Sequence, residues 1–260
     1  MNLLLENWRQ QKQVFITNLL VIRNRPTKRS VHDLRVSIKK IRSYLRLSEK
    51  ISGKEWKQSF SSIAALYRSA GRVSDLDVSF TLINKKSRTE PLLTRLKEYL
   101  SANRTVARKW IRQDAILFKE QGFAVLEDHF KTELTNREIT QKIIHFSRSK
   151  IKSTKQISVH SEKNIHKTRK LLKDVYNWVK IGEQDMINKF IAIKALDNML
   201  KHLGNWQDHF VLSGKTMQYK KELVIDKKEK EILDSLENDL DAGHEKELEK
   251  AMKQWKGINK

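Results

Sequence analysis

Two stretches of the sequence carry histidine, arginine and lysine at the same spacing. Residues 31–42 read VHDLRVSIKKIR and residues 165–176 read IHKTRKLLKDVY, so both contain the pattern apolar-His-x-x-Arg-x-x-x-Lys-x-apolar. Arginine offers a planar fork of donors that fits phosphate oxygens, and lysine offers a mobile point charge. Neither stretch adds a second histidine or a carboxylate at metal-ligand spacing on the same helix face. The pattern therefore favours binding of phosphate groups over binding of a metal ion.

On a helix, these cations lie beside an apolar stripe rather than opposite it. The stripe of the first stretch consists of Val31, Leu34, Ile38, Ile41 and Leu45. The basic stripe, rotated from it by roughly 100°, consists of His32, Arg35, Lys39, Arg42 and Arg46. The second stretch repeats the arrangement with His166, Arg169, Lys173, Tyr176 and Lys180. Because the flank of a buried stripe faces a groove between helices, we expect both basic stripes to line one central cleft.

A second repeat follows each stretch in register. Residues 67–75 (YRSAGRVSD) align with residues 200–208 (LKHLGNWQD), so the match spans two helices in each half. Internal repeats of this kind indicate duplicated structural units. We predict a single domain over residues 1–260, with halves 1–150 and 158–260 related by a pseudo-twofold axis.

The elements that carry these motifs are predicted to be helices throughout. Only 8 Gly and 2 Pro occur in 260 residues, and strands with period-2 alternation are hard to find. Residues 147–158 (SRSKIKSTKQIS) are interpreted as a polar linker. Helical periodicity predicts segments at 2–23, 30–51, 54–70, 74–86, 91–121, 123–150, 160–181, 185–203, 205–221 and 226–255.

The net positive charge of the chain favours an anionic partner. The net charge is +22, and residues 1–220 hold 44 Lys and Arg against 20 Asp and Glu, so the excess lies in the folded body and not in a tail. A compact domain pays for this excess in self-repulsion, which a polyanion relieves. The absence of cysteine excludes disulfides, thiolate metal sites and a cysteine nucleophile. No signal peptide or long apolar run is found, so we expect a cytoplasmic protein with no membrane partner.

The predicted anion ligands come mainly from the two basic stripes and the helices that follow them. Both histidines are interpreted as phosphate donors, with a hydrogen-bonded core histidine as the alternative; as imidazolium they would bind more tightly at mildly acidic pH. Lys28, Arg29 and Arg112 are weaker candidates. The candidate set is His32, Arg35, Lys39, Lys40, Arg42, Arg46, Arg68, Arg72, Arg104, Arg108, His166, Arg169, Lys173 and Lys201.

Three carboxylates follow the predicted helix breaks: Asp75, Asp77 and Asp208. They are interpreted either as helix caps and salt-bridge partners that orient an arginine, or as ligands of a Mg²⁺ or Ca²⁺ that accompanies the phosphates. The sequence contains no P-loop, no nucleophile elbow and no carboxylate pair with an acid and base division. We therefore expect a binding protein without cofactor, resident metal or enzymatic activity.

The motifs resemble those of the CHAD family, the conserved histidine α-helical domain. The resemblance rests on VHDLRVSIKKIRSYLRL at 31–47, GRVSDLDV at 71–78, IHKTRKLLKDVYNWV at 165–179 and LGNWQD at 203–208. It implies an all-α fold of two four-helix bundles with a basic central channel that binds inorganic polyphosphate, and a location at polyphosphate granules. The chain departs from the family at Ser74, where an arginine is usual, and at Tyr176, which stands where the first half has Arg42.

Two other functions remain open on the sequence. The same charge would suit a protein that binds nucleic acid or another polyanion, although most tryptophans occupy apolar periodic positions and no recognition helix is evident. An enzyme acting on polyphosphate ranks third, because nucleotide and metal motifs are missing. The acidic segment near 226–250 is either a solvated amphipathic helix or a helix that folds over the basic cleft and controls access.

Overall fold

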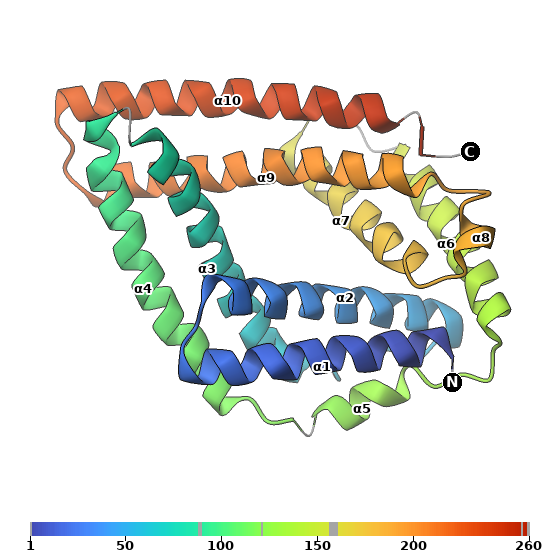
Figure 1. Ribbon diagram of the computed structural model, residues 1–260. Coiled ribbons are helices and arrows are strands. Elements are labelled where there is room, and N and C mark those ends of the chain that lie inside the picture. Colours follow the sequence, from blue (N-terminus) through green and yellow to red (C-terminus); the bar gives the residue numbers. More distant parts are fainter. Residues whose placement is uncertain (1, 88–89, 121, 156–160, 256, 259–260) are drawn as a thin grey trace.

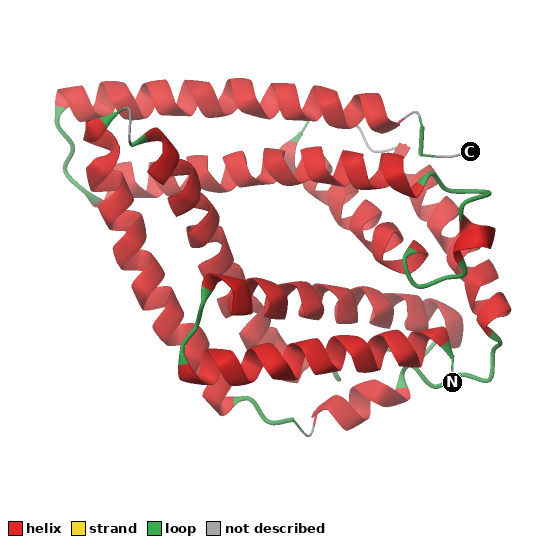
Figure 2. Ribbon diagram, viewed as in Figure 1, coloured by secondary structure: helices red, strands yellow, loops and turns green. Residues whose placement is uncertain are grey.

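Helices make up all the regular structure that is described. The computed structural model describes residues 2–87, 90–120, 122–155, 161–255 and 257–258, and within them Figure 2 shows helices joined by loops, with no strand. The predicted all-α class is confirmed.

The helices pack as two groups that touch along equivalent members. In the first half α1 packs on α2 and α3 on α4. In the second α6 packs on α7 and α9 on α10, so α6 goes with the second half, whereas the predicted division at residues 150–158 placed most of it in the first. Between the halves, α2 contacts α7 and α3 contacts α9 (Figure 1). Each of these contacts joins a helix to its counterpart in the repeat, which is consistent with a pseudo-twofold axis. The bounds are α1 Leu3–Asn24, α2 Lys28–Ser52, α3 Ser61–Lys86, η1 Pro91–Leu93, α4 Thr94–Leu117, α5 Gly122–Asp128, α6 Asn136–Lys155, α7 Glu162–Val179, α8 Gln184–Ile187, α9 Ile193–Glu222 and α10 Lys227–Trp255.

Local sequence signals fix both ends of α2, the helix that carries the first basic stripe. Thr27 caps the N-terminus in a capping box with Ser30, whose backbone N–H donates to the Thr27 hydroxyl. Gly53 ends the helix in the left-handed region, at φ 75°, where glycine carries no steric penalty. The break predicted at this glycine is confirmed, so the first basic stripe lies on one uninterrupted helix.

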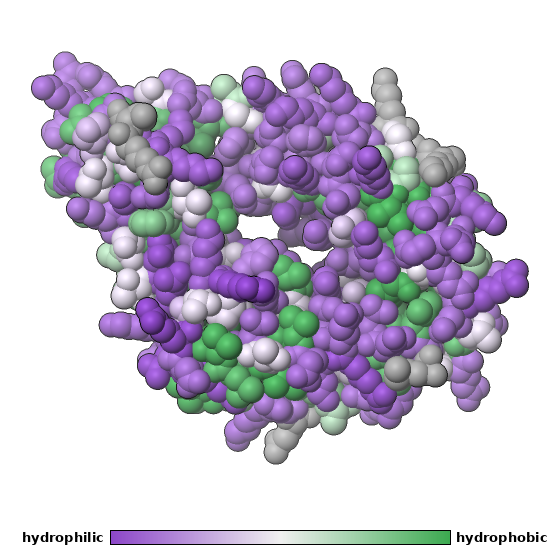
Figure 3. Space-filling view, viewed as in Figure 1, coloured by the Kyte–Doolittle hydropathy of each residue, from purple (hydrophilic) through white to green (hydrophobic). Residues whose placement is uncertain are grey.

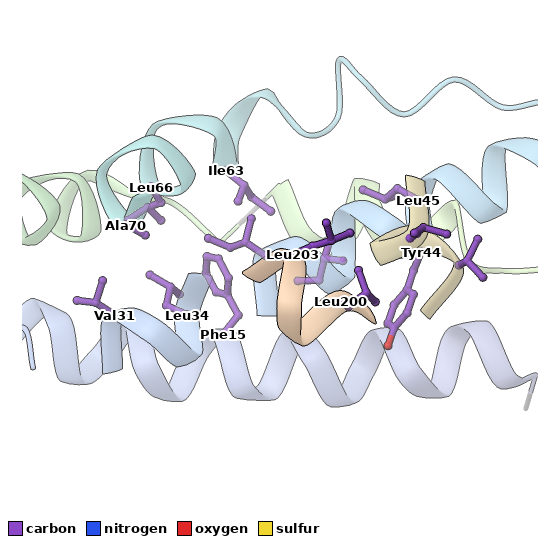
Figure 4. Close-up of a cluster of buried hydrophobic side chains, with 14 of the residues drawn as sticks. Phe15, Val31, Leu34, Tyr44, Leu45, Ile63, Leu66, Ala70, Leu200 and Leu203 are labelled. Carbon is purple, nitrogen blue, oxygen red and sulfur yellow. The ribbon is translucent and has the colours of Figure 1, made fainter. Parts of the chain in front are cut away.

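The apolar stripes hold the halves together. The five stripe residues of α2, among them Val31, Leu34 and Leu45, are fully buried. The same spacing in the second stretch predicts a buried stripe on α7, and its five residues are buried as well: Ile165, Thr168, Leu172, Val175 and Val179. Figure 4 shows Leu200 and Leu203 of α9 within the same cluster of buried side chains as residues of α1, α2 and α3. Burying each of these side chains contributes about 1.5–3 kcal/mol, so the core fixes both basic helices in place.

Four of the predicted segments or boundaries differ from the structure. The segments 54–70 and 74–86 form one helix, α3, and 185–203 and 205–221 are largely one helix, α9, with the short α8 before it. Gly71 and Gly204 are interior helix positions. One glycine destabilises a helix by only about 1 kcal/mol, which is less than the stabilisation from tertiary packing. The expected linker at 147–158 is helical through residue 155, and its remainder lies outside the described residues. The segment 123–150 divides into α5 and α6.

A buried ion triad joins α2, α6 and α7. The Asp174 carboxylate, whose side chain is 8 % exposed, binds the Arg46 guanidinium at 2.9 Å and the Lys150 ammonium at 3.2 Å. The Trp178 indole N–H donates to the backbone carbonyl of Ser43 close by, at 2.8 Å. Because Asp174 is the one counter-ion that two cations share at a helix junction between the halves, its charge matters for folding more than that of a surface pair does.

Replacing Asp174 by Asn should lower the free energy of unfolding by about 3 kcal/mol, because Arg46 and Lys150 lose their counter-ion. Urea denaturation at pH 7 measures the loss. Asp128→Asn is the control, since Asp128 forms an exposed surface pair with Lys131 and its removal should leave the urea midpoint unchanged. Equal midpoints for both variants would contradict a stabilising role of the triad.

Candidate polyanion-binding site

Charged side chains from four helices meet where the two halves face each other. Arg35 and Lys39 of α2 lie near Arg169 and Lys173 of α7, close enough for each group to shift the protonation of another. Asp75 of α3 and Asp208 of α9 complete the group. We call these six residues the central cluster: Arg35, Lys39, Asp75, Arg169, Lys173 and Asp208. Its members come in pairs that occupy the same position in each half.

The molecule is hollowed at this place. In Figure 3 the visible face has a central opening bordered by hydrophilic side chains, in the region that Figure 1 shows between α2, α3 and α9. The Arg35 guanidinium reaches across to α3, where its Nη2 lies 3.2 Å from the Asp75 carboxylate. A Cβ on Gly71 of α3 would lie 3.9 Å from the same nitrogen, so the arginine lies against this part of the helix.

The cations of the cluster are held in a setting that disfavours their charge. Partial burial, followed by the nearby Arg35 and Arg169, lowers the pKa of Lys39 from 10.5 to about 7. Burial, followed by Arg169, lowers the pKa of Lys173, and burial lowers the pKa of Arg169 although Asp208 opposes the shift. Each charged form has lost water that its protein partners do not replace. An anion placed among these groups would restore the missing interaction.

The carboxylates only partly compensate the cations. Burial raises the pKa of Asp208, against the opposing effect of Arg169. Asp75 is bound to Arg35, and Asp77 lies 3.1 Å from Arg104 and 2.9 Å from Arg108. Asp75 and Asp77 are therefore salt-bridge partners of arginines, which was one of the two interpretations. All three aspartates lie inside α3 or α9, and not after a helix break as predicted. Among the described residues no group of three or more metal-ligating side chains could hold a metal ion.

Other predicted ligands lie next to the cluster, and aromatic rings contact some of the cations in this region. Lys40 lies near enough to Lys173 to lower its pKa. The Arg42 guanidinium lies over the Tyr67 ring, 5.6 Å from its centroid, and Lys173 lies over the Tyr176 ring at 5.1 Å. The aromatic faces hold the cations in place without neutralising them.

The structure brings another pair of predicted ligands together on α4. Arg104 and Arg108 share the buried Asp77, and Arg104 lies over the Phe80 ring at 4.1 Å. Two guanidinium groups on one carboxylate leave one positive charge in excess, so this pair can extend an anion site along α3 and α4.

Four further predicted residues are exposed, and one is engaged elsewhere. His32, Arg68 and Lys201 are exposed on α2, α3 and α9, and Arg72 is exposed with its guanidinium 5.5 Å from the Trp110 ring. Arg46, in contrast, is bound by Asp174 in the ion triad. Arg46 shares this carboxylate with Lys150, so its guanidinium is held at the helix junction.

The second histidine has an aromatic environment. The His166 ring meets the rings of Trp206 and Phe210 edge-on, with centroids 5.0 and 5.2 Å away. Partial burial, followed by Lys170 and Arg169, lowers its pKa below 6.5. His166 is therefore neutral at pH 7 and can donate only one N–H, which agrees in part with the alternative of a packed histidine.

Two members of the site were not found from the sequence. Tyr67 lies beside Arg42 and Arg169, and Asp197 interacts with Lys173 and accepts a hydrogen bond from Tyr176. The repeat alignment gives no signal for Asp197, because the first half has Ala64 at the matching position. Tyr67 aligns with Leu200 and likewise has no counterpart.

The acidic C-terminal helix does not cover the site. In Figure 1, α10 runs along α9 on the side away from α2, and α9 separates it from the central opening. The idea of a helix folded over the cleft is therefore wrong for this structure. No helix in the described ranges is long and apolar enough to cross a membrane.

Comparison with known proteins identifies the family. The CHAD domain model matches residues 8–216. The chain belongs to the CHAD family. This family is associated with polyphosphate, and its match ends just before the last residues of α9. Comparison with the curated proteins gives no match.

Two solved CHAD-type structures have the same fold. The CHAD domain from the plant Ricinus communis superposes with a TM-score of 0.77 at 14 % identity, over 97 % of this chain and 90 % of that one. PptA from Streptomyces chartreusis gives a TM-score of 0.71 at 14 % identity, over 98 % of each chain. At this identity the likeness concerns the fold, so the ligand must be argued from the side chains of this CHAD protein.

Replacing Lys39 by Met should stabilise the free protein at pH 6–7 by about 1–2 kcal/mol, because an apolar side chain has no charge to desolvate. The pKa of Lys39 is about 7 in the folded chain and 10.5 in the reference state. Between these values the unfolded chain holds the proton and the folded chain does not, so wild-type stability rises with pH. The gain should therefore shrink toward pH 10.

Urea denaturation at pH 6, 7, 8.5 and 10 tests this expectation. The control is Lys167→Met, which removes an exposed lysine from α7 and should give no gain at any of these pH values. A Lys39→Met variant that is less stable than wild type at pH 7 would show that the lysine is well compensated in the free protein.

Proposed function

We propose that this CHAD protein binds inorganic polyphosphate non-catalytically in the central hollow, with the central cluster as its main anion site. The observation that carries the proposal is the meeting of four cations, three of them partly buried, with only two carboxylates. A linear polyanion supplies closely spaced negative charges that can contact α2 and α7 together. Membership of a family associated with polyphosphate supports the same ligand.

The ligand contacts follow from the chemistry of each group. Arg35 and Arg169 offer guanidinium forks to phosphate oxygens, while Lys39 and Lys173 offer ammonium charges between them. Arg42, Arg104 and Arg108 extend the positive surface beyond the cluster. Binding does not require the protein to supply a metal ion, and a cytoplasmic location at polyphosphate granules would follow from the ligand.

Binding should depend on the cluster and not on total charge. The variant Arg35→Ala, Lys39→Ala, Arg169→Ala, Lys173→Ala should bind polyphosphate roughly 100-fold more weakly at physiological salt, and each lost phosphate contact should reduce the log–log salt slope by about 0.7. A titration with fluorescently labelled polyphosphate at several salt concentrations gives both quantities. The matched control changes four exposed lysines to alanine, namely Lys57, Lys119, Lys167 and Lys189, and removes the same charge.

The same titration with competitors separates the proposal from nucleic-acid binding. Double- and single-stranded nucleic acid at equal phosphate concentration should displace labelled polyphosphate poorly. If nucleic acid displaces polyphosphate equally well, and if the cluster variant and the lysine control lose the same affinity, binding depends on the total positive charge and not on the central cluster.

The aspartates of the cluster should restrain anion binding. Asp75→Asn removes the counter-ion of Arg35, so we expect affinity for polyphosphate to rise about 5- to 10-fold in EDTA, with a decrease in stability of the free protein. The alternative, in which Asp75 holds Mg²⁺ beside the phosphates, predicts a loss of affinity in Mg²⁺ instead. Isothermal titration of wild type and variant, in Mg²⁺ and in EDTA, distinguishes the two roles.

A further inference from the structure

The central cluster contains an amine in a setting that suits a nucleophile. Lys39 makes no ion pair in the part of the chain that the structure describes, and three of its neighbours are Arg35, Arg169 and Lys173. The carboxylate that acts on it, Asp75, is itself bound to Arg35 at 3.2 Å. Lys39 is partly exposed, so a small molecule can reach it.

Cationic neighbours and partial burial are the two conditions that make a lysine reactive in proteins. They favour the neutral amine, whose lone pair attacks electrophilic carbon, over the ammonium. With a pKa of about 7, about half of the Lys39 side chains carry a free amine at neutral pH. Lys173 differs, because it is exposed and interacts with Asp197, which opposes the loss of its proton.

We propose that Lys39 is a self-acylation site that takes the acyl group of small acyl phosphates. The guanidinium groups of Arg35 and Arg169 hold the phosphate, which rests on the proposed phosphate-binding function, and the amine of Lys39 faces the adjoining carbonyl. The Nζ lone pair attacks the carbonyl carbon, and the bond from that carbon to the phosphate oxygen breaks. The products are an amide on Lys39 and inorganic phosphate, which leaves with the bonding electrons and takes up the proton lost by the amine as hydrogen phosphate.

Acylation changes the anion site itself. The amide is uncharged, so the cluster loses one of its four cations, and the acyl group occupies space at its centre. Polyphosphate covers the amine and, by its negative charge, favours the unreactive ammonium form. Acyl phosphates and polyphosphate therefore exclude one another at this site.

The test is acylation of the full chain by acetyl phosphate at pH 6, 7 and 8, followed by peptide mapping with mass spectrometry. Lys39 should be acetylated at least tenfold faster at pH 7 than the exposed Lys167, which serves as a reference in the same molecule. Its rate should level off above about pH 7, and saturating polyphosphate should suppress it. Equal rates at Lys39 and Lys167 would overturn the proposal.

A second donor and two variants separate the parts of the argument. An uncharged N-hydroxysuccinimide ester of acetate reports amine reactivity alone; if it selects Lys39 and acetyl phosphate does not, the assignment to acyl phosphates is wrong. Arg169→Gln should raise the pH midpoint and slow the reaction at pH 7. Lys39→Arg removes the primary amine, so no acetyl group should be found at position 39.

Binding of polyphosphate by the same preparation distinguishes this proposal from the function on which it rests. If polyphosphate binds but acetylation shows no preference for Lys39, only the acylation proposal is overturned. Selective acetylation of Lys39 by acetyl phosphate without polyphosphate binding upholds the site and contradicts the polyphosphate proposal.

Discussion

The arrangement of the molecule depends on burying apolar stripes that have cations directly beside them. On α2 the fully buried Ile38 precedes Lys39, and on α7 the buried Leu172 precedes Lys173. Because the stripes must pack, the cations cannot move apart, and the contacts of α2 with α7 bring the two sets together. Their repulsion and desolvation cost stability that the core supplies. The free protein therefore stores an unfavourable electrostatic energy that an anion can release.

The two halves contribute unequally to this site. Arg42 of the first half corresponds to Tyr176 in the second, and Asp197, which acts on Lys173, corresponds to Ala64. The first half also adds Arg104 and Arg108 around Asp77. Since the excess positive charge is greater toward α3 and α4, a bound polyanion should make more contacts with the first half. The charges around the cluster are therefore distributed unequally between the two halves.

Sequence periodicity was sufficient for the all-α fold class and for the buried stripes of α2 and α7. Helix faces depend on local spacing, so the apolar and basic stripes could be predicted from α2 and α7 alone. The partners of long side chains come from other helices and could not: Arg46 is bound by Asp174, and His166 packs against aromatic rings of α9. The helix breaks predicted at Gly71 and Gly204 were wrong, because both glycines are tolerated inside packed helices.

The acidic helix α10, which lies beyond the residues matched by the family model, also affects the distribution of charge. Its carboxylates pair with cations and polar groups that lie away from the cluster: Asp239 binds Lys86 at 2.6 Å, Glu237 binds Lys220 at 2.8 Å, and Glu247 contacts His202 at 2.9 Å. These pairs reduce the positive charge along α9 and at the end of α3, while α9 separates α10 from the opening. Compensation on the outer face leaves the cluster as a place where buried positive charge is in excess. An anion approaching this basic chain is therefore directed toward its centre.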